Sequence, residues 1–236
     1  MTDEAKIKLE QGVLEASDEE SARKYLETQL RQAEQHFLAL PAEATDEARA
    51  RIYLEKSNAL LGLERNEEAW NEAKRAFDIF IEQELWSEAI EACDILYQTE
   101  QPASILALAH GVWLSITYPV DPEQTIVMLS YVVDETPADS DGAAVAAATA
   151  HYIVGLRTED EEKHNSLSFL TTNLIAKVAQ RHGDVKSQEA LDFWMEKMEL
   201  KDPEVFLPRM GSILDVIVGD SWWFDRDALR EKLPVN

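Results

Sequence analysis

Two residues have the types and spacing that could hold a metal ion. Glu161 and His164 form a Glu-x-x-His pair, which places both side chains on one face of a helix and supplies half of a di-iron carboxylate site. A second such pair would be needed, but no other histidine has a glutamate three residues before it. Glu161 has a simpler role as the capping-box partner of Thr158 at a helix start. We therefore predict no metal and no other cofactor, and keep a metal-dependent helical enzyme as an alternative function.

Other catalytic signatures are missing from the sequence. It contains no Gly-x-Gly-x-x-Gly, Walker, Gly-x-Ser-x-Gly or His-Glu-x-x-His motif and no paired Cys-x-x-Cys. The single cysteine, Cys93, shares its helix with Glu91 and Asp94, whereas a reactive thiol needs a cationic neighbour. A buried, reduced thiol is the expected state. We predict that the chain is not an enzyme.

The net charge restricts the partners. There are 46 acidic and 22 basic residues, giving a net charge of −24, and such a field repels nucleic-acid phosphates and anionic membrane surfaces. The first ten residues have acids where a signal peptide needs bases and contain no apolar run. The longest apolar stretch, residues 105–120, is shorter than a membrane span. These features predict a cytoplasmic protein with no nucleic-acid or membrane partner.

Acidic and basic residues are distributed differently along the chain. Between Arg75 and Arg157 there is no Lys or Arg, while the 81 intervening residues contain 13 acids. One interpretation is a solvated acidic face over an apolar core, and the other is a surface that binds a basic segment of another protein. Glu84, Glu88 and Glu91 are the partner-binding candidates, because spacings of three and four place side chains near one another on a helix.

Three amphipathic helical patterns fill residues 46–98. Thr45, followed by two acids, marks the start of the first helix, which is expected to end near Leu63. The second helix follows the turn at residues 64–66, and the third starts near Ser87. Because turns this short place consecutive helices antiparallel and in contact, we expect helical hairpins.

This stretch resembles the tetratricopeptide repeat. The matching positions are an early aromatic residue, a small and a large apolar residue in the first helix, and small residues along the second: Tyr53, Ser57, Leu60, Ala69, Ala73 and Ala76. Two features depart from the family: Lys56 stands where it prefers Leu, and Glu-Ala recurs after 20 residues instead of roughly 34. The resemblance covers about 55 of the 236 residues. It implies a right-handed array that binds proteins, with an irregular helical bundle as the alternative.

The resemblance also bears on the type of ligand. Tetratricopeptide domains that hold chaperone C-termini surround a carboxylate with Lys, Arg and Asn, and Asn58 stands at the place of their first Asn. The helices that would add the cations fall in the base-free stretch. The resemblance therefore implies a different ligand, with Asn58 kept as a candidate contact.

The flanking segments also predict helices. We expect a polar lead-in at residues 1–16, a helix from a capping box at Ser17 to Leu40, and further helices opened by Pro102, Pro122 and Thr158. The remaining expected elements are a helix at residues 185–199, a region interrupted at Pro208 and a short helix at residues 226–232. The predicted fold is an all-α, antiparallel helical-hairpin array over residues 1–157. Residues 158–236 are predicted to form a helical cap packed on it, or to continue it as one domain.

Three adjacent aromatic residues near the C-terminus are the last candidate site. Trp222, Trp223 and Phe224 either plug the open end of the array or form an exposed anchor for a partner. Together these features predict a non-catalytic interaction or scaffold protein, such as an assembly factor. A structural homodimer formed through an apolar C-terminal surface is a further alternative.

Overall fold

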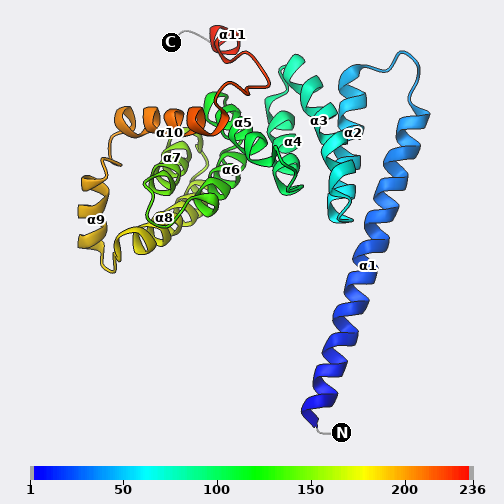
Figure 1. The fold of residues 1–236 in the computed structure, drawn as a ribbon, viewed down its shortest axis with the longest axis horizontal. Coiled ribbons are helices and arrows are strands. Elements are labelled where there is room, and N and C mark those ends of the chain that lie inside the picture. The colour runs from blue at the N-terminus through cyan, green and yellow to red at the C-terminus, as the bar shows by residue number, and fades with distance from the viewer. Residues whose placement is uncertain (1–2, 234–236) are drawn as a thin grey trace.

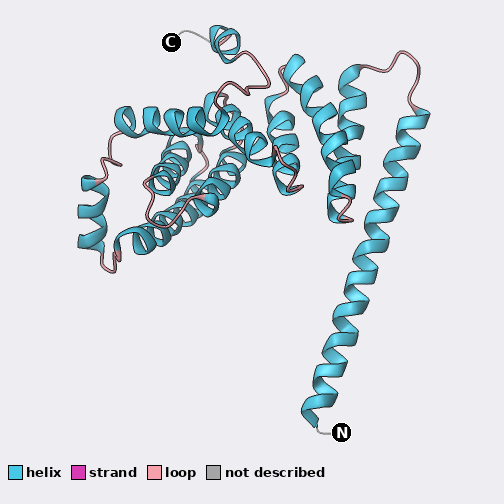
Figure 2. Ribbon diagram, in the orientation of Figure 1, coloured by secondary structure: helices cyan, strands magenta, loops and turns pink. Residues whose placement is uncertain are grey.

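The protein is built from helices alone in the part of the chain that is described. The computed structural model describes residues 3–233, with side chains from residue 18 onward. These residues form eleven α-helices and no strand (Figure 1, Figure 2). None of the described helices combines the length and apolarity needed to cross a membrane. The predicted all-α class is confirmed.

The helices follow one another with short connections. Their bounds are α1 Asp3–Ala39, α2 Asp46–Gly62, α3 Asn66–Glu82, α4 Trp86–Gln98, α5 Ser104–Thr117, α6 Pro122–Glu135, α7 Gly142–Arg157, α8 Glu161–Gly183, α9 Gln188–Lys197, α10 Pro203–Val218 and α11 Arg226–Glu231. From α1 to α8, each helix packs against the next one along the chain. The predicted array of helical hairpins is confirmed.

The hairpins repeat with a period of about 38 residues. Helices α2, α4, α6 and α8 begin 40, 36 and 39 residues apart, and α3, α5 and α7 begin 38 and 38 residues apart. Helix α2 contacts α4, α4 contacts α6, and α6 contacts α8, so these four form one layer. The two Glu-Ala pairs that lie 20 residues apart are in different helices of their hairpins: the first is in α3, the second helix of one hairpin, and the next is in α4, the first helix of the following hairpin. Their spacing is therefore not the period of the array.

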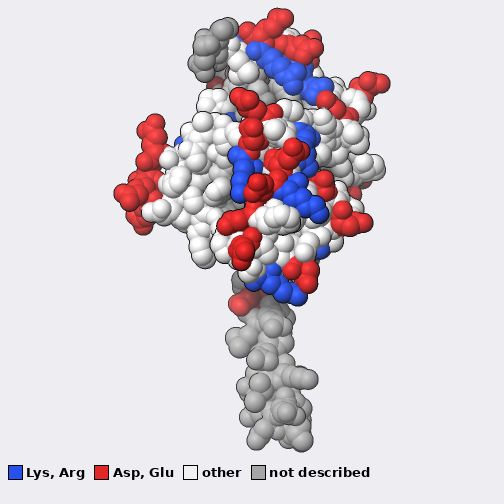
Figure 3. All heavy atoms as spheres, turned by 90° about the vertical axis from the view of Figure 1, so that its left-hand side faces the viewer, with Lys and Arg blue, Asp and Glu red and all other residues white. Residues whose placement is uncertain are grey.

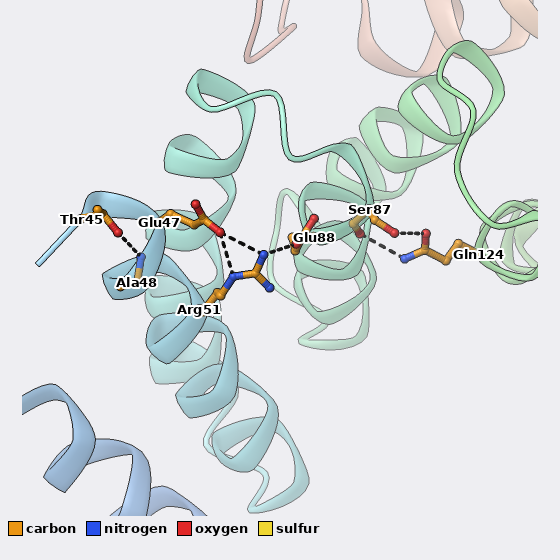
Figure 4. Close-up of polar contacts among 7 residues, drawn as sticks. All are labelled: Thr45, Glu47, Ala48, Arg51, Ser87, Glu88 and Gln124. Carbon is orange, nitrogen blue, oxygen red and sulfur yellow. Dashed lines mark hydrogen bonds and ion pairs between the residues drawn. The ribbon is translucent and has the colours of Figure 1, made fainter.

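Side-chain caps set several of the predicted helix starts. The Thr45 hydroxyl accepts from the Ala48 N–H at 3.1 Å (Figure 4), and Asp121 accepts from the Glu123 N–H at 2.9 Å with Pro122 in the first helical position. The predicted start at Pro102 is wrong. Pro102 lies in a turn before α5, which begins at Ser104.

At α8 the predicted capping residue is also wrong. Asp160, not Thr158, accepts from the Lys163 N–H at 2.8 Å. The Thr158 hydroxyl is buried and has no hydrogen-bond partner among the described residues. A carboxylate one position before the first helical residue reaches the free N–H groups directly, which removes the need for the Thr158–Glu161 box.

Two predicted breaks are absent from the described helices. Helix α1 starts at Asp3, so residues 3–16 are helical and the capping box from Ser17 lies inside the helix. This segment contains mostly good helix formers and no Pro. Helix α10 continues past Pro208, its sixth residue, so the loss of one backbone hydrogen bond at this proline does not end the helix.

The centre of the array depends on small side chains. All residues of α7 from Ala143 to Ala150 are buried, as are most of α5. Gly111 of α5 lies between α4 and α6: an added Cβ would be 2.8 Å from the Cβ of Cys93 and closer still to the Met128 methyl group. These small residues allow the helices to approach closely.

Gly111→Ala is therefore expected to destabilise the fold by about 1–3 kcal/mol through overpacking, although Ala favours helix. Gly211→Ala in α10 is the matched control, because nothing lies within 4 Å of its added Cβ. It should raise stability by up to about 1 kcal/mol. Urea unfolding of both variants checks this, and equal effects would contradict the close approach at Gly111.

Candidate protein-binding surface

Bases from distant parts of the sequence neutralise much of the base-free stretch. Seven of its 13 acids form ion pairs: Asp78, Glu84, Glu88, Asp121, Glu123, Asp134 and Asp141. Except for Lys74, their partners come from outside the same helix, such as Lys163 of α8, which lies 2.8 Å from Asp121. The absence of Lys and Arg from this stretch of sequence therefore does not leave these seven acids without counter-charges, because the array brings remote helices together.

A ladder of polar contacts links the first helices of successive hairpins (Figure 4). Arg51 of α2 donates to Glu88 of α4 at 2.6 Å and to Glu47 at 3.1 Å. One hairpin further, Gln124 of α6 accepts from the Ser87 hydroxyl at 2.6 Å and donates to its carbonyl at 3.0 Å. Both interhelical links join residues 37 positions apart, which is close to the hairpin period. Glu88 therefore helps to set the register of α2 against α4.

Glu84 does not share a helix with the other two acidic candidates. It lies in the turn before α4, with a left-handed φ of 58°, and its carboxylate pairs with Lys232 at 2.6 Å. Because α4 begins at Trp86, helical spacing does not relate Glu84 to Glu88 and Glu91. Glu84 instead connects the α3–α4 turn to the end of α11.

Glu91 lies on α4 between two other acids, Glu88 and Asp94. Partial desolvation raises the pKa of its carboxyl group, and the neighbouring charges of Glu88 and Asp94 raise it further. Like charges this close disfavour ionisation. Arg51, which pairs with Glu88 and Glu47, lowers the pKa of Glu91 by less than burial and the two neighbouring acids raise it.

Two tyrosines connect these acids to α6. Tyr97 and Tyr131 lie with ring centroids 4.6 Å apart, and the Tyr97 hydroxyl donates to Glu135 at 2.7 Å. Burial and the nearby Asp94 raise the pKa of Tyr131 to about 12. Burial, followed by the Glu135 hydrogen bond, also raises the pKa of Tyr97.

We call this set the α4–α6 acidic cluster: Glu91, Asp94, Tyr97, Tyr131 and Glu135. Among the described residues, no Lys or Arg forms an ion pair with its three carboxylates, whereas the adjacent Asp134 pairs with Lys177 at 3.3 Å. The sequence indicated Glu91. It gave no signal for Glu135 or the tyrosines, because they become neighbours only when α6 packs beside α4.

Asn58 is exposed on α2. It lines a shallow pocket together with Leu26 of α1 and with Gln98 and Glu100 at the end of α4. The pocket contains no Lys or Arg among its described lining residues. Asn58 therefore lies near an acidic residue and not in a cationic carboxylate clamp.

The C-terminal aromatic residues lie across α3 and α5, because the chain returns after α10 toward the earlier hairpins (Figure 1). The Trp223 ring stacks on His110 at 4.4 Å and meets the edge of Phe77 at 5.4 Å, while Phe224 lies 5.3 Å from Trp113. All three residues of the run at 222–224 are partly buried. They cover the side of the array, where they are neither a plug at its open end nor a fully exposed anchor.

His110 holds this segment in place. The backbone N–H of Trp223 donates to its Nε2 at 3.0 Å, so Nδ1 carries the proton and donates to the Leu106 carbonyl. Burial lowers the pKa of His110 to about 4, with further lowering by Lys74 and Arg226. In the sequence, the one signal for this role was a polar residue inside the apolar stretch 105–120.

The Glu161–His164 pair lies at the start of α8. Glu161 is the first helical residue. Burial lowers the pKa of His151, and the nearby His164 lowers it further. Among the described residues, no group of three or more His, Cys, Asp or Glu side chains is placed to hold a metal ion. Cys93 is buried, and burial raises its thiol pKa well above the usual value.

Comparison with family models, with curated proteins and with solved structures finds no match for the chain. The function must therefore be inferred from the geometry of the protein itself.

The His110 contact predicts acid sensitivity. Its pKa is about 4 in the folded state and near 6.5 when unfolded, so the unfolded state binds more protons between these values. Stability should fall as the pH drops from about 6.5 to about 4, by up to roughly 3 kcal/mol from this residue. Below the folded pKa this contribution becomes constant.

Urea unfolding at several pH values checks this expectation. His110→Gln, whose side-chain oxygen can still accept the Trp223 N–H, should show a shallower loss of stability across that pH range. His36→Gln, at an exposed position of α1, should keep the slope of the unmodified protein. Identical slopes for all three proteins would contradict the role of His110.

Proposed function

We propose that this protein is a non-catalytic, tetratricopeptide-like scaffold that binds a basic segment of a partner protein on the α4–α6 acidic cluster. The observation that carries the proposal is that Glu91, Asp94 and Glu135 stay without an ion-pair partner among the described residues. Six other acids of the same stretch are paired by remote bases, and Asp78 pairs with Lys74 of its own helix.

The energetics of the cluster favour a cationic ligand. Partial desolvation raises the pKa of Glu91, and repulsion from the nearby charges of Glu88 and Asp94 raises it further, so the ionised form of this carboxyl group is disfavoured in the free protein. A Lys or Arg side chain placed there would relieve this repulsion and gain charge-assisted hydrogen bonds. The adjacent Tyr97 and Tyr131 rings offer aromatic surface on which a guanidinium or ammonium group can rest.

Several features support the tetratricopeptide-like part of the proposal. Helices α2 and α3 form a hairpin in which Ala69, Ala73 and Ala76 are fully buried, as small residues at close helix crossings require. The hairpin recurs about every 38 residues. Repeat arrays of this type present extended surfaces suited to binding proteins, and a cytoplasmic scaffold or assembly factor is the role that fits such a surface.

The proposal changes which acids should be tested. Glu88 and Glu84 are engaged by Arg51 and Lys232, so substituting them would disturb the fold as well as the charge. Glu91, together with Asp94 and Glu135, provides the cleaner test.

Peptides that bind the protein should first be selected from a random library. The affinity of the selected peptides should then be measured by fluorescence anisotropy. We expect enrichment of Lys and Arg, and affinity that falls steeply as the ionic strength rises from roughly 0.01 M to about 1 M, where the Debye length shrinks from about 30 Å to about 3 Å. The variant Glu91→Gln, Asp94→Asn, Glu135→Gln should bind at least about tenfold more weakly, because three favourable charge contacts are lost.

A second triple variant provides the control. Glu43→Gln, Glu189→Gln and Glu204→Gln change the net charge equally at exposed positions outside the cluster. It should retain most of the affinity. Equal weakening in both variants would show that net charge alone attracts the peptides, and the proposed site would be wrong.

A further inference from the structure

Helix α8 lacks the second helix that completes each earlier hairpin. Helices α2, α4 and α6 are each packed against a following helix of similar length, α3, α5 or α7. The helix that follows α8 is α9, which has only 10 residues, whereas α8 has 23. Helix α9 meets α8 near the C-terminal end of α8, where Leu191 of α9 lies near Gln180 of α8. Helix α10 packs instead on α5 and α7 (Figure 1). One side of α8 is therefore left open.

The open side is unusual in its chemistry. Residues 165–176 contain no charged side chain, although 29% of the chain is charged. Most of this stretch is exposed, including Phe169 at 71% and Leu170 at 52%. We call its exposed residues the α8 open face: Asn165, Ser166, Phe169, Leu170, Thr172, Asn173 and Ala176.

This pattern differs from the other uncharged helical stretches. The uncharged stretches of α5, α6 and α7 are mostly buried in the array, so their composition follows from the core. Burial within the chain does not explain the α8 open face. Depletion of charge around an exposed aromatic residue is typical of the centre of a protein interface, and the end of a repeat array normally carries a polar outer face for solubility.

We infer that a second copy of this chain covers the α8 open face, with α8 packed against α8 about a two-fold axis. Two molecules that each carry a net charge of −24 repel one another. They can approach closely where neither presents a carboxylate, and the α8 open face meets this condition on both sides. A two-fold axis makes one self-complementary face sufficient for both subunits.

The side chains of the face suit this packing. Ser166, Asn173 and Ala176 are small or short, which permits close approach of two helices. Phe169 supplies the large apolar group that can anchor an interface. Figure 3 views the molecule from the side on which α8 and α9 lie and shows a broad uncharged area beside a band where acids and bases alternate.

Self-association should respond to salt in the opposite direction from peptide binding. Screening reduces the repulsion between two acidic molecules, whereas the apolar contact at Phe169 does not depend on charge. Raising the ionic strength should therefore strengthen the dimer while it weakens a basic peptide at the α4–α6 acidic cluster. The two surfaces can be tested separately.

Sedimentation equilibrium of the full chain at low and high salt tests the inference. We expect a monomer–dimer equilibrium that shifts toward dimer at high salt. Phe169→Lys should raise the dimer dissociation constant at least about tenfold, because it places a charge at the centre of the contact. The matched control is Val216→Lys on α10, an apolar position that is 86% exposed, and it should leave the dissociation constant unchanged.

Cross-linking adds a test of the geometry. Asn173→Cys introduces an exposed thiol, while Cys93 is buried, and a flexible bis-maleimide should link two copies of this variant faster than two copies of Asn58→Cys on α2. Circular dichroism and peptide binding should be unchanged in Phe169→Lys. A monomer at every concentration and salt, a dimer unaffected by Phe169→Lys, or loss of peptide binding in that variant would each overturn the inference.

Discussion

The close approach of helices at the centre of the array is the constraint on which the other features depend. Gly111 allows α5 to lie against α4 and α6, and the buried alanines of α7 fill the next position along the array. A core packed this tightly has little space for charged groups, which are costly to bury. The acids and bases are therefore confined to the outer surfaces. There, the spacing of the hairpins along the chain determines which acids and bases lie close enough to form ion pairs.

The packing of successive hairpins leaves some acidic residues paired with bases of neighbouring helices and others unpaired among the described residues. Glu88 and Asp121 lie opposite bases of neighbouring helices and help to fix the array. No Lys or Arg in the described part of the chain pairs with Glu91 or Glu135, and burial, followed by the like charges of Glu88 and Asp94, raises the pKa of Glu91. The same packing thus produces the ladder of polar contacts between hairpins and the acidic surface on which we propose that a cationic ligand binds.

Much of the fold could be predicted from local patterns, because helix periodicity and caps act over a few residues. Thr45 and Asp121 were found in this way. The helical stretch before Ser17 and the continuity at Pro208 were missed, since local stop signals are weak against a long favourable helix. Of the candidate site, Glu91 could be predicted, but Tyr131 and Glu135 could not, because their proximity to it depends on packing between separate hairpins.

The return of the C-terminal segment gives this repeat array an unusual topology. The Trp223 N–H meets His110 across 113 residues of sequence, the Tyr118 hydroxyl meets the Leu229 carbonyl across 111, and Lys232 meets Glu84 across 148. Simple arrays rely on nearest-neighbour contacts and can fold in parts, whereas contacts of high sequence separation are slow to form and join distant regions into one cooperative unit. During synthesis, the aromatic surface of α3 and α5 stays uncovered until the segment around Trp223 has left the ribosome, so this segment completes the packing of hairpins made earlier.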